Sequence, residues 1–346
     1  MTIEDLKQIR LYRQHLTDPT DKLTVVKDLC GLQCQFMSYA YHSLRIRCSE
    51  TLDPETFGEG LVKNWTLRGT VHIFSEDDLP LFKYDTGSYK SDEWDDTTYN
   101  GTLWISGERK FYFAKLLCDL VSTGTNTREE LRLKCREAGM TDIEESYIFN
   151  GWGGLFRPLC ERGFLIYKVQ EKKAFALSPE YVPTKEGFAK REQMRRYLEH
   201  IAPATIRDIS YFFGYSQTEV KRILDALPVK DLCIDGVDYF YMEEQPGDCP
   251  EIPDCIFLSG FDQLMLGYEK KDSIFLPPEH LRGIFTLTGI VLPALLLKGR
   301  VAGRWSRKGK KIEITPFRKL SKKEIEAVES CASKLWGKNT VVVYDD

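Results

Sequence analysis

The feature that most constrains the fold is a repeated order in which short capped helices precede a β-hairpin. The order is clearest between residues 205 and 242. Thr205 and Ser216 are suitable N-cap residues, and Gly214 is suited to end the first of two helices. The turn Asp235-Gly236 favours a hairpin after them. The predicted helices are 206–213 and 217–226, and the predicted strands are Val229–Ile234 and Val237–Met242. Two closely joined helices before a hairpin are typical of a winged helix.

The same order is predicted twice more, upstream of this unit, from apolar residues at helical spacing followed by alternating residues. The first copy has helices at 2–16, 22–31, 36–47 and 53–63 and a strand at Trp65–Phe74. The second copy has helices at 108–122, 128–138 and 147–162 and strands at Phe164–Tyr167 and Ala174–Leu177. Between them, residues 84–107 have no clear period and predict an irregular acidic insertion.

The chain becomes rich in strand patterns after a Pro-rich linker that starts at Gln245. Strands are predicted at Ile256–Leu258, Phe285–Thr288, Val291–Leu297, Val301–Ser306 and Lys311–Thr315, and a last helix at 321–336. The predicted class is therefore α+β, with tandem winged-helix units followed by a small antiparallel β-rich C-terminal domain. The expected domains are residues 1–107, 108–183, 184–245 and 246–346.

Composition excludes several classes of protein. Of the 346 residues, 42% are hydrophobic and 29% are charged, which is typical of globular domains. The acidic start Met1–Asp5 does not resemble a signal peptide, and the longest apolar run, Gly289–Leu297, is too short to span a bilayer. We therefore expect a cytoplasmic protein that does not associate with a membrane. The 10 cysteines form no CxxC pair and there are only 5 histidines, so we expect reduced thiols, no metal and no cofactor.

Charge is distributed unevenly, although the net charge is only −4. Residues 298–319 carry a run of lysines and arginines against the single acid Glu313, whereas residues 85–96 are mainly acidic. One face of the protein is therefore suited to phosphate, while the rest repels it. The alternative is that the basic run is simply a solvated surface.

Gln33 and Gln35 stand out in the stretch Gly31–Met37, between two predicted helices. A carboxamide offers both donors and an acceptor without ever carrying charge. Side chains two residues apart share a face only on extended backbone. A joint role for the two glutamines therefore requires extended chain between the helices. The alternative is that they cap helix ends.

Six motifs occur in an order that resembles the bacterial winged-helix DNA glycosylases of the AlkZ/YcaQ type. They are Gln33-Cys34-Gln35, Arg68–His72, Trp152–Phe156, Pro203–Thr205, Ser259–Gln263 and Gly299–Trp305. The resemblance extends from the N-terminus to about Phe317 and places the chain in the branch with two glutamines. It implies tandem winged helices, excision of N7-alkylated purines, including purines in interstrand crosslinks, and a catalytic role for Gln33 and Gln35.

The resemblance predicts a monofunctional DNA glycosylase whose partner is double-stranded DNA with alkylated purines, acting as a monomer. An N7-alkylated purine is cationic and leaves as a neutral base, so two amides that position water near C1′ are sufficient in principle. Two other hypotheses are a transcriptional regulator and a non-catalytic damage-binding protein. Three dissimilar units do not provide the symmetric dimer that palindromic operators usually require.

Further candidate residues each have a structural alternative. On one predicted strand, Arg68, Thr70 and His72 share a face that can meet phosphate, although His72 can equally bond internally. Asp262 is interpreted as part of a domain joint and as the reserve catalytic carboxylate, while Trp152 and Phe156 are interpreted as core. The predicted DNA-backbone contacts of the basic hairpin are Arg300, Arg304, Trp305, Arg307, Lys308, Lys310 and Lys311.

Overall fold

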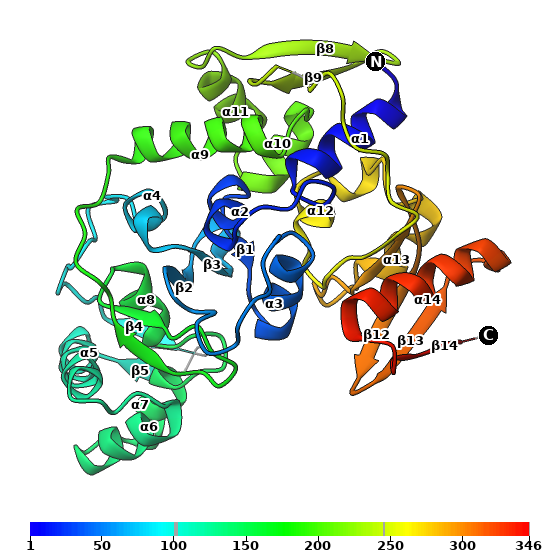
Figure 1. Ribbon diagram of the computed structural model, residues 1–346. Coiled ribbons are helices and arrows are strands. Elements are labelled where there is room, and N and C mark those ends of the chain that lie inside the picture. The colour runs from blue at the N-terminus through cyan, green and yellow to red at the C-terminus, as the bar shows by residue number, and fades with distance from the viewer. Residues whose placement is uncertain (100–102, 245, 346) are drawn as a thin grey trace. The chain divides into compact units, whose positions relative to one another are not determined.

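The computed structural model describes residues 1–99, 103–244 and 246–345. The chain forms two compact units, of which the first contains Met1–Asp53 and Gln193–Asp346 and the second contains Pro54–Glu192 (Figure 1). The boundary at Asp53 divides the first of the four predicted domains between the two units. The four-part division itself stays a prediction. Gln245 of the predicted linker, residues 100–102 of the predicted insertion and Asp346 lie outside the described residues.

The first unit begins with three predicted helices, each of which the structure confirms with slightly shorter bounds. They are α1 (Ile3–Arg13), α2 (Lys22–Asp28) and α3 (Met37–Arg45). Thr2 and Asp5 form a capping box at the start of α1. A short extended segment, β1 (Leu32–Gln33), lies between α2 and α3.

A helical module with a hairpin follows in the same unit, as the cap residues predicted. Its elements are α9 (Glu186–His200, which spans the unit boundary), α10 (Ile206–Phe213), α11 (Gln217–Leu224), β8 (Lys230–Ile234) and β9 (Val237–Tyr241). Thr205 and Ser216 cap α10 and α11 through their side chains, and Gly214 ends α10 in the left-handed conformation. The hairpin lies beside these two helices (Figure 1).

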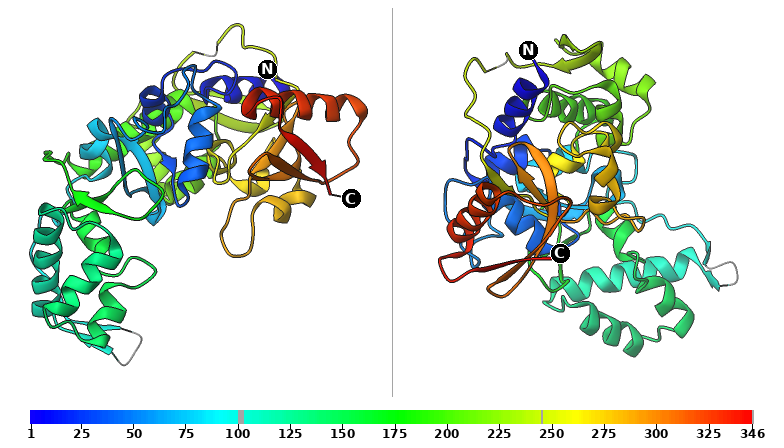
Figure 2. Two further views of the ribbon diagram at one scale, coloured as in Figure 1. Left: turned by 60° about the horizontal axis from the view of Figure 1, so that its bottom comes forward. Right: turned by 90° about the vertical axis from the view of Figure 1, so that its right-hand side faces the viewer.

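The C-terminal part of the first unit is a five-stranded sheet covered by a helix. The strands, in spatial order, are β10 (Cys255–Phe257), β11 (Ala294–Leu297), β12 (Arg300–Lys308), β13 (Lys311–Pro316) and β14 (Val341–Tyr344). The helix is α14 (Lys322–Trp336), which lies against the sheet (Figure 2). Its residues Val328 and Ala332 are buried in the core that the helix shares with the sheet. The prediction of a purely antiparallel sheet is wrong at its edge, because β14 pairs in parallel with β13.

Short helical segments connect β10 to β11. They are α12 (Gln263–Leu266), η3 (Lys270–Asp272), η4 (Pro278–His280) and α13 (Leu281–Ile284). The strand predicted at Phe285–Thr288 does not form. Phe285 makes only an isolated bridge to Val291 across a turn at Gly289.

The second unit combines a four-stranded antiparallel sheet with four helices. The strand order within the unit is β3 (Val71–Ser75), β2 (Leu61–Trp65), β6 (Leu165–Tyr167) and β7 (Phe175–Leu177). The helices are α5 (Gly107–Ser122), α6 (Arg128–Glu137), α7 (Asp142–Ile148) and α8 (Phe156–Glu161). Pairing of Lys63 with Tyr167 joins two hairpins that the sequence assigned to separate units.

Three predictions within the second unit are corrected. Residues 54–60 form turns that lead into β2, so the predicted helix 53–63 is absent. The predicted helix 147–162 is interrupted, because α7 begins earlier and ends at Ile148, and a glycine-rich loop separates it from α8. The predicted irregular insertion includes the paired strands β4 (Thr97–Tyr99) and β5 (Leu103–Ile105). Short segments η1 (Leu67–Gly69), η2 (Glu76–Asp78) and α4 (Leu79–Phe82) complete the unit.

The search for membrane spans covered the described residues. None of the helices found there is both long and apolar enough to pass through a bilayer.

Candidate active site and DNA-binding residues

Gln33 and Gln35 lie in the break between α2 and α3, where the sequence placed them. Cys30 and Gly31 both have positive φ, so the chain turns sharply after α2 and continues as extended β1. Gln33 is 7% exposed, whereas Gln35 is exposed in the bend that precedes α3. The break between helices is thus confirmed, and the joint orientation of the two amides stays a prediction.

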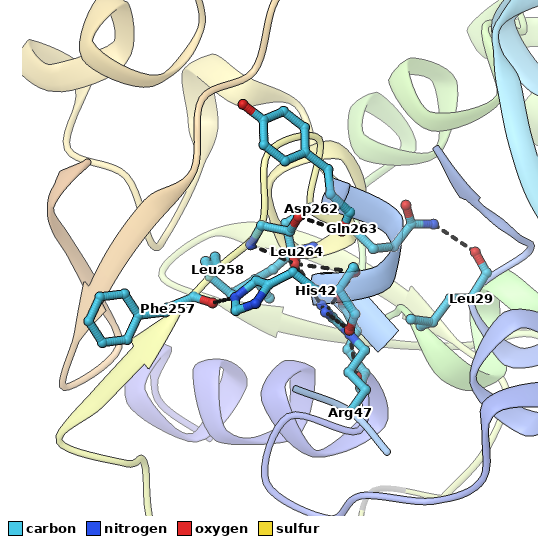
Figure 3. Close-up of polar contacts among 12 residues, drawn as sticks. Leu29, His42, Arg47, Phe257, Leu258, Asp262, Gln263 and Leu264 are labelled. Carbon is cyan, nitrogen blue, oxygen red and sulfur yellow. Dashed lines mark hydrogen bonds and ion pairs between the residues drawn. The ribbon is translucent and has the colours of Figure 1, made fainter. Parts of the chain in front are cut away.

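The segment before the glutamines is held by the C-terminal part of the same unit. The side-chain Nε2 of Gln263 donates a hydrogen bond of 2.6 Å to the carbonyl oxygen of Leu29, the C-cap residue of α2 (Figure 3). Gln263 is buried and is the first residue of α12. This bond fixes the end of α2, and therefore the start of the turn that leads to Gln33.

A buried ion pair joins Arg47, two residues after α3, to Asp262, the N-cap residue of α12. Arg47 donates to both oxygens of Asp262, at 2.7 and 3.0 Å, and both side chains are fully buried (Figure 3). Asp262 also accepts from the backbone N–H of Leu264, as the N-cap of α12. Burial raises the pKa of the Asp262 carboxyl, but Arg47 and the backbone hydrogen bonds outweigh it, so the pKa lies below its usual value.

An exposed aromatic residue follows Gln35 directly. Phe36 is 47% exposed and stacks on Phe261, with ring centroids 6.3 Å apart. Phe36 and Tyr39 pack edge to face, with ring centroids 5.4 Å apart. A Cβ at Gly260 would lie 2.4 Å from the Tyr39 ring, so glycine is required there. Sequence reasoning missed Phe36, because an aromatic residue at a helix start is ordinarily buried.

The basic hairpin formed by β12 and β13 carries the predicted phosphate contacts. Arg304 and Lys308 are exposed, and Lys308 lies opposite Lys311 across the hairpin. Lys311 pairs with Glu313 at 2.7 Å. Within the described residues, no carboxylate lies within ion-pair distance of Arg304, Lys308 or Lys310. These three cations are therefore available for an anionic ligand.

Comparison with known proteins identifies the family of this chain. A family model described as "DNA glycosylase AlkZ-like" matches residues 26–336. The chain belongs to the AlkZ-like DNA glycosylase family. A curated relative from Streptomyces sahachiroi, named "Interstrand DNA cross-link repair glycosylase", is 25% identical over 94% of this chain and 93% of its own length. The solved structure "Streptomyces sahachiroi DNA glycosylase AlkZ" has the same fold, with a TM-score of 0.78, 22% identity and full coverage of both chains.

Membership of the AlkZ-like family makes this chain a DNA glycosylase, an enzyme class that acts on glycosyl bonds of DNA. The resemblance inferred from the six motifs is therefore confirmed. A search of the described residues for metal sites finds no group of three or more histidine, cysteine or acidic side chains.

Two predicted DNA contacts in this AlkZ-like chain are corrected because their side chains are buried. Trp305 packs on Phe257 and Trp336, and its Nε1 donates to the carbonyl oxygen of Leu258 at 2.8 Å. His72 has its Nδ1 2.8 Å from Thr66 Oγ1, which is the internal bonding expected as the alternative. Burial, with Arg68 nearby, lowers the pKa of His72 to about 3.

Arg68, Thr70 and His72 do not share one strand face, so that prediction is also wrong. Arg68 lies in the η1 turn with a φ of 55°, and Thr70 ends that turn. Only His72 lies in β3. Arg68 is half-buried, and its role as a DNA contact stays a prediction.

The remaining candidates divide between core and surface. Arg300 is exposed and lies 3.9 Å from Glu279, while Arg307 lies 5.6 Å from the Trp336 ring. Phe156 is fully buried, as predicted, but Trp152 is 87% exposed, so its assignment to the core is wrong. The glycines on both sides of Trp152 are a loop signal that the predicted helix 147–162 passed over.

Proposed function

We propose that this AlkZ-like protein hydrolyses the N-glycosidic bond of N7-alkylated purines in double-stranded DNA. The observation that carries the proposal is the exposed Gln35, one residue removed from the buried Gln33, at a break between two helices of the family's fold. The name of the Streptomyces relative supports including purines joined in interstrand crosslinks. Neither amide titrates, so the proposed site works with neutral groups only.

The substrate's own charge makes such a site chemically sufficient. An N7-alkylated purine leaves as a neutral base and needs no general acid. The protein must place a water molecule near C1′ and favour positive charge on the sugar. The carboxamide oxygens of Gln33 and Gln35 accept hydrogen bonds from that water. The burial of Gln33 gives it a defined orientation, and the exposure of Gln35 lets it meet DNA.

The reserve candidate, Asp262, is unsuited to this chemistry. Its carboxylate is fully buried and both oxygens accept hydrogen bonds from Arg47. A general base must reach the water that it activates. Asp262 is therefore a structural residue in this proposal, which favours its interpretation as part of a domain joint.

The proposed attack by water makes the enzyme monofunctional, because no amine forms a covalent bond with the sugar. The expected product is an intact abasic strand together with the free base. Strand cleavage in step with base release would instead require an amine nucleophile, whose Schiff base with the sugar borohydride reduces to a stable protein–DNA adduct.

The decisive experiment is incubation of the protein with a duplex that contains N7-methylguanine, followed by measurement of free base. Gln33→Ala and Gln35→Ala should each reduce release, while Ser38→Ala, an exposed polar change in the same segment, is the matched control. Binding without release by the wild type would favour the damage-binding alternative. Release that neither glutamine substitution affects would place the active site elsewhere.

A pH profile tests the neutral character of the site. A catalytic glutamate would produce an acid limb near its ordinary pKa, about 4 to 5. The proposed site has no such group, so the single-turnover rate per folded molecule should show no such limb. Circular dichroism at each pH measures the folded fraction. A limb that persists after this correction would assign the chemistry to a carboxylate.

A further inference from the structure

Trp152 lies at the tip of a loop whose conformation is closely defined. Its backbone N–H donates to the side-chain oxygen of Asn150 at 2.9 Å. The N–H of Gly153 donates to the carbonyl oxygen of Asn150 at 3.1 Å, and that of Leu155 donates to the carbonyl oxygen of Ile148 at 3.1 Å. Hydrogen bonds within the loop that separates α7 from α8 therefore hold its backbone on both sides of Trp152. The side chain of Trp152 is 87% exposed.

Two glycines make this loop possible. Gly153 has a φ of 119° and Gly154 a φ of 53°. A Cβ at Gly154 would lie 2.2 Å from the carbonyl oxygen of Ile148, and a Cβ at Gly153 would lie 2.7 Å from Cβ of Arg157. Only glycine fits either position. The sequence thus specifies a backbone that keeps a large aromatic ring in solvent, where an indole is least favourable.

Cations surround the base of the loop. Arg128 donates to the carbonyl oxygen of Asn150 at 2.8 Å. Arg157 contacts the loop at Gly153 and also reaches the η1 turn, since a Cβ at Gly69 would lie 3.2 Å from its Nη2. Gly69 directly follows Arg68, so Arg157 lies between the two segments, with its aliphatic stem at the tryptophan loop and its guanidinium at the η1 turn.

A further cation, Lys173, lies close enough to Arg128 to affect its own titration. Burial lowers the pKa of Lys173, and the neighbouring cations Arg128 and Lys63 lower it further. The acid Glu161 accepts from Arg157 at 2.8 Å and offsets part of the charge. We call this surface the tryptophan patch and define it by Trp152, Arg68, Arg128, Arg157 and Lys173.

We infer that the tryptophan patch is a DNA-binding surface of the second unit, distinct from the glutamine site and the basic hairpin. The ring of Trp152 inserts at a partly unstacked base step of the duplex and stacks on the base exposed there, and the arginines beside it contact neighbouring phosphates. Aromatic rings combined with cations are suited to nucleic acid, because every base has a π-face and every nucleotide a phosphate. The inference rests on the proposed function only in taking DNA as the ligand.

The test is DNA binding by the full chain, measured by fluorescence anisotropy with N7-methylguanine-containing and undamaged duplexes. Trp152→Ala should weaken binding about tenfold, as loss of one stacked base does. Its salt dependence should be unchanged, because no charge is removed. Trp152→Phe should restore most of the affinity, since the ring remains. Arg68→Ala should reduce the salt slope by about 1.

Trp104→Ala is the matched control, because Trp104 is a second exposed tryptophan in the same unit, 57% exposed. It should leave binding unchanged, and all variants should unfold at the wild-type temperature. Trp152→Ala with wild-type affinity, or a wild type that binds neither duplex, would overturn the inference. A wild type that binds but releases no base would contradict the proposed function alone, and the Trp152 comparison would still decide the patch.

Discussion

The glutamine segment and the Arg47–Asp262 pair lie in the same unit, yet they use polarity in opposite ways. The pair is ionised, fully buried and bonded on both carboxylate oxygens. The glutamine segment is neutral and ends in an exposed amide. The difference teaches that, in this protein, the carboxylate in a promising motif is buried and engaged in an ion pair, while the group suited to the proposed chemistry carries no charge.

The largest expected effect is on stability, from breaking the buried pair. Arg47→Ala leaves the Asp262 carboxylate buried without its cation and should lower the free energy of unfolding by about 3–5 kcal/mol. Urea denaturation measures this change. Arg282→Ala, which removes an exposed arginine of the same unit, is the control and should change stability by no more than about 0.5 kcal/mol.

The second prediction separates the effect on catalysis from the effect on stability. Gln35→Ala should lower the single-turnover rate of base release by about 10²–10³-fold, comparable to loss of one donor from an oxyanion site, with little effect on unfolding. Asp262→Asn should do the reverse and destabilise the fold while the rate per folded molecule is preserved. Equal loss of rate in both variants would break the comparison and return Asp262 to the active site.

A third prediction concerns pH and the joint that contains the pair. His42 is buried, and its Nε2 lies 2.7 Å from the carbonyl oxygen of Phe257 (Figure 3). Burial lowers the pKa of His42 to about 4. The unfolded chain takes up a proton at a higher pH than the folded chain, near 6.5, so stability is complete above that value. It should fall by about 3 kcal/mol as pH decreases from 6.5 to 4.

Urea titrations at pH 7.5, 6 and 5 measure this dependence, and His280→Gln, at a half-buried histidine of the same unit, serves as the control. His42→Gln should flatten the dependence in the same range. His72, with its pKa lowered to about 3, contributes a dependence of the same sign from the second unit and remains in both variants. A stability that does not change between pH 7.5 and 5 would contradict the buried, neutral state of both rings.

The smallest expected effects are in the basic hairpin. Arg304→Ala and Lys308→Ala should each weaken DNA binding and reduce the salt slope by about 1, without changing the rate at saturating DNA. Lys311→Ala should do less, because Lys311 already pairs with Glu313. Isothermal titration at several salt concentrations gives the slopes. A salt slope equal to that of the wild type in all three variants would show that the hairpin cations are merely solvated.

The sequence by itself determined the elements that local signals specify. Cap residues such as Thr205 and Ser216 located helices, and Asp235-Gly236 located a hairpin, because each satisfies backbone groups within a few residues. The break that carries Gln33 and Gln35 was predictable for the same reason. The ordered motifs were sufficient for the family.

Only the tertiary structure decided which polar and aromatic residues are available to a ligand. Asp262 and Trp305 belong to motifs that pointed to chemistry and DNA, yet burial by partners distant in sequence makes them structural. Trp152 was interpreted as a core residue, yet two glycines with no room for a Cβ place it in solvent. Exposure depends on packing between segments that are far apart in the chain, and local sequence patterns carry no record of that packing.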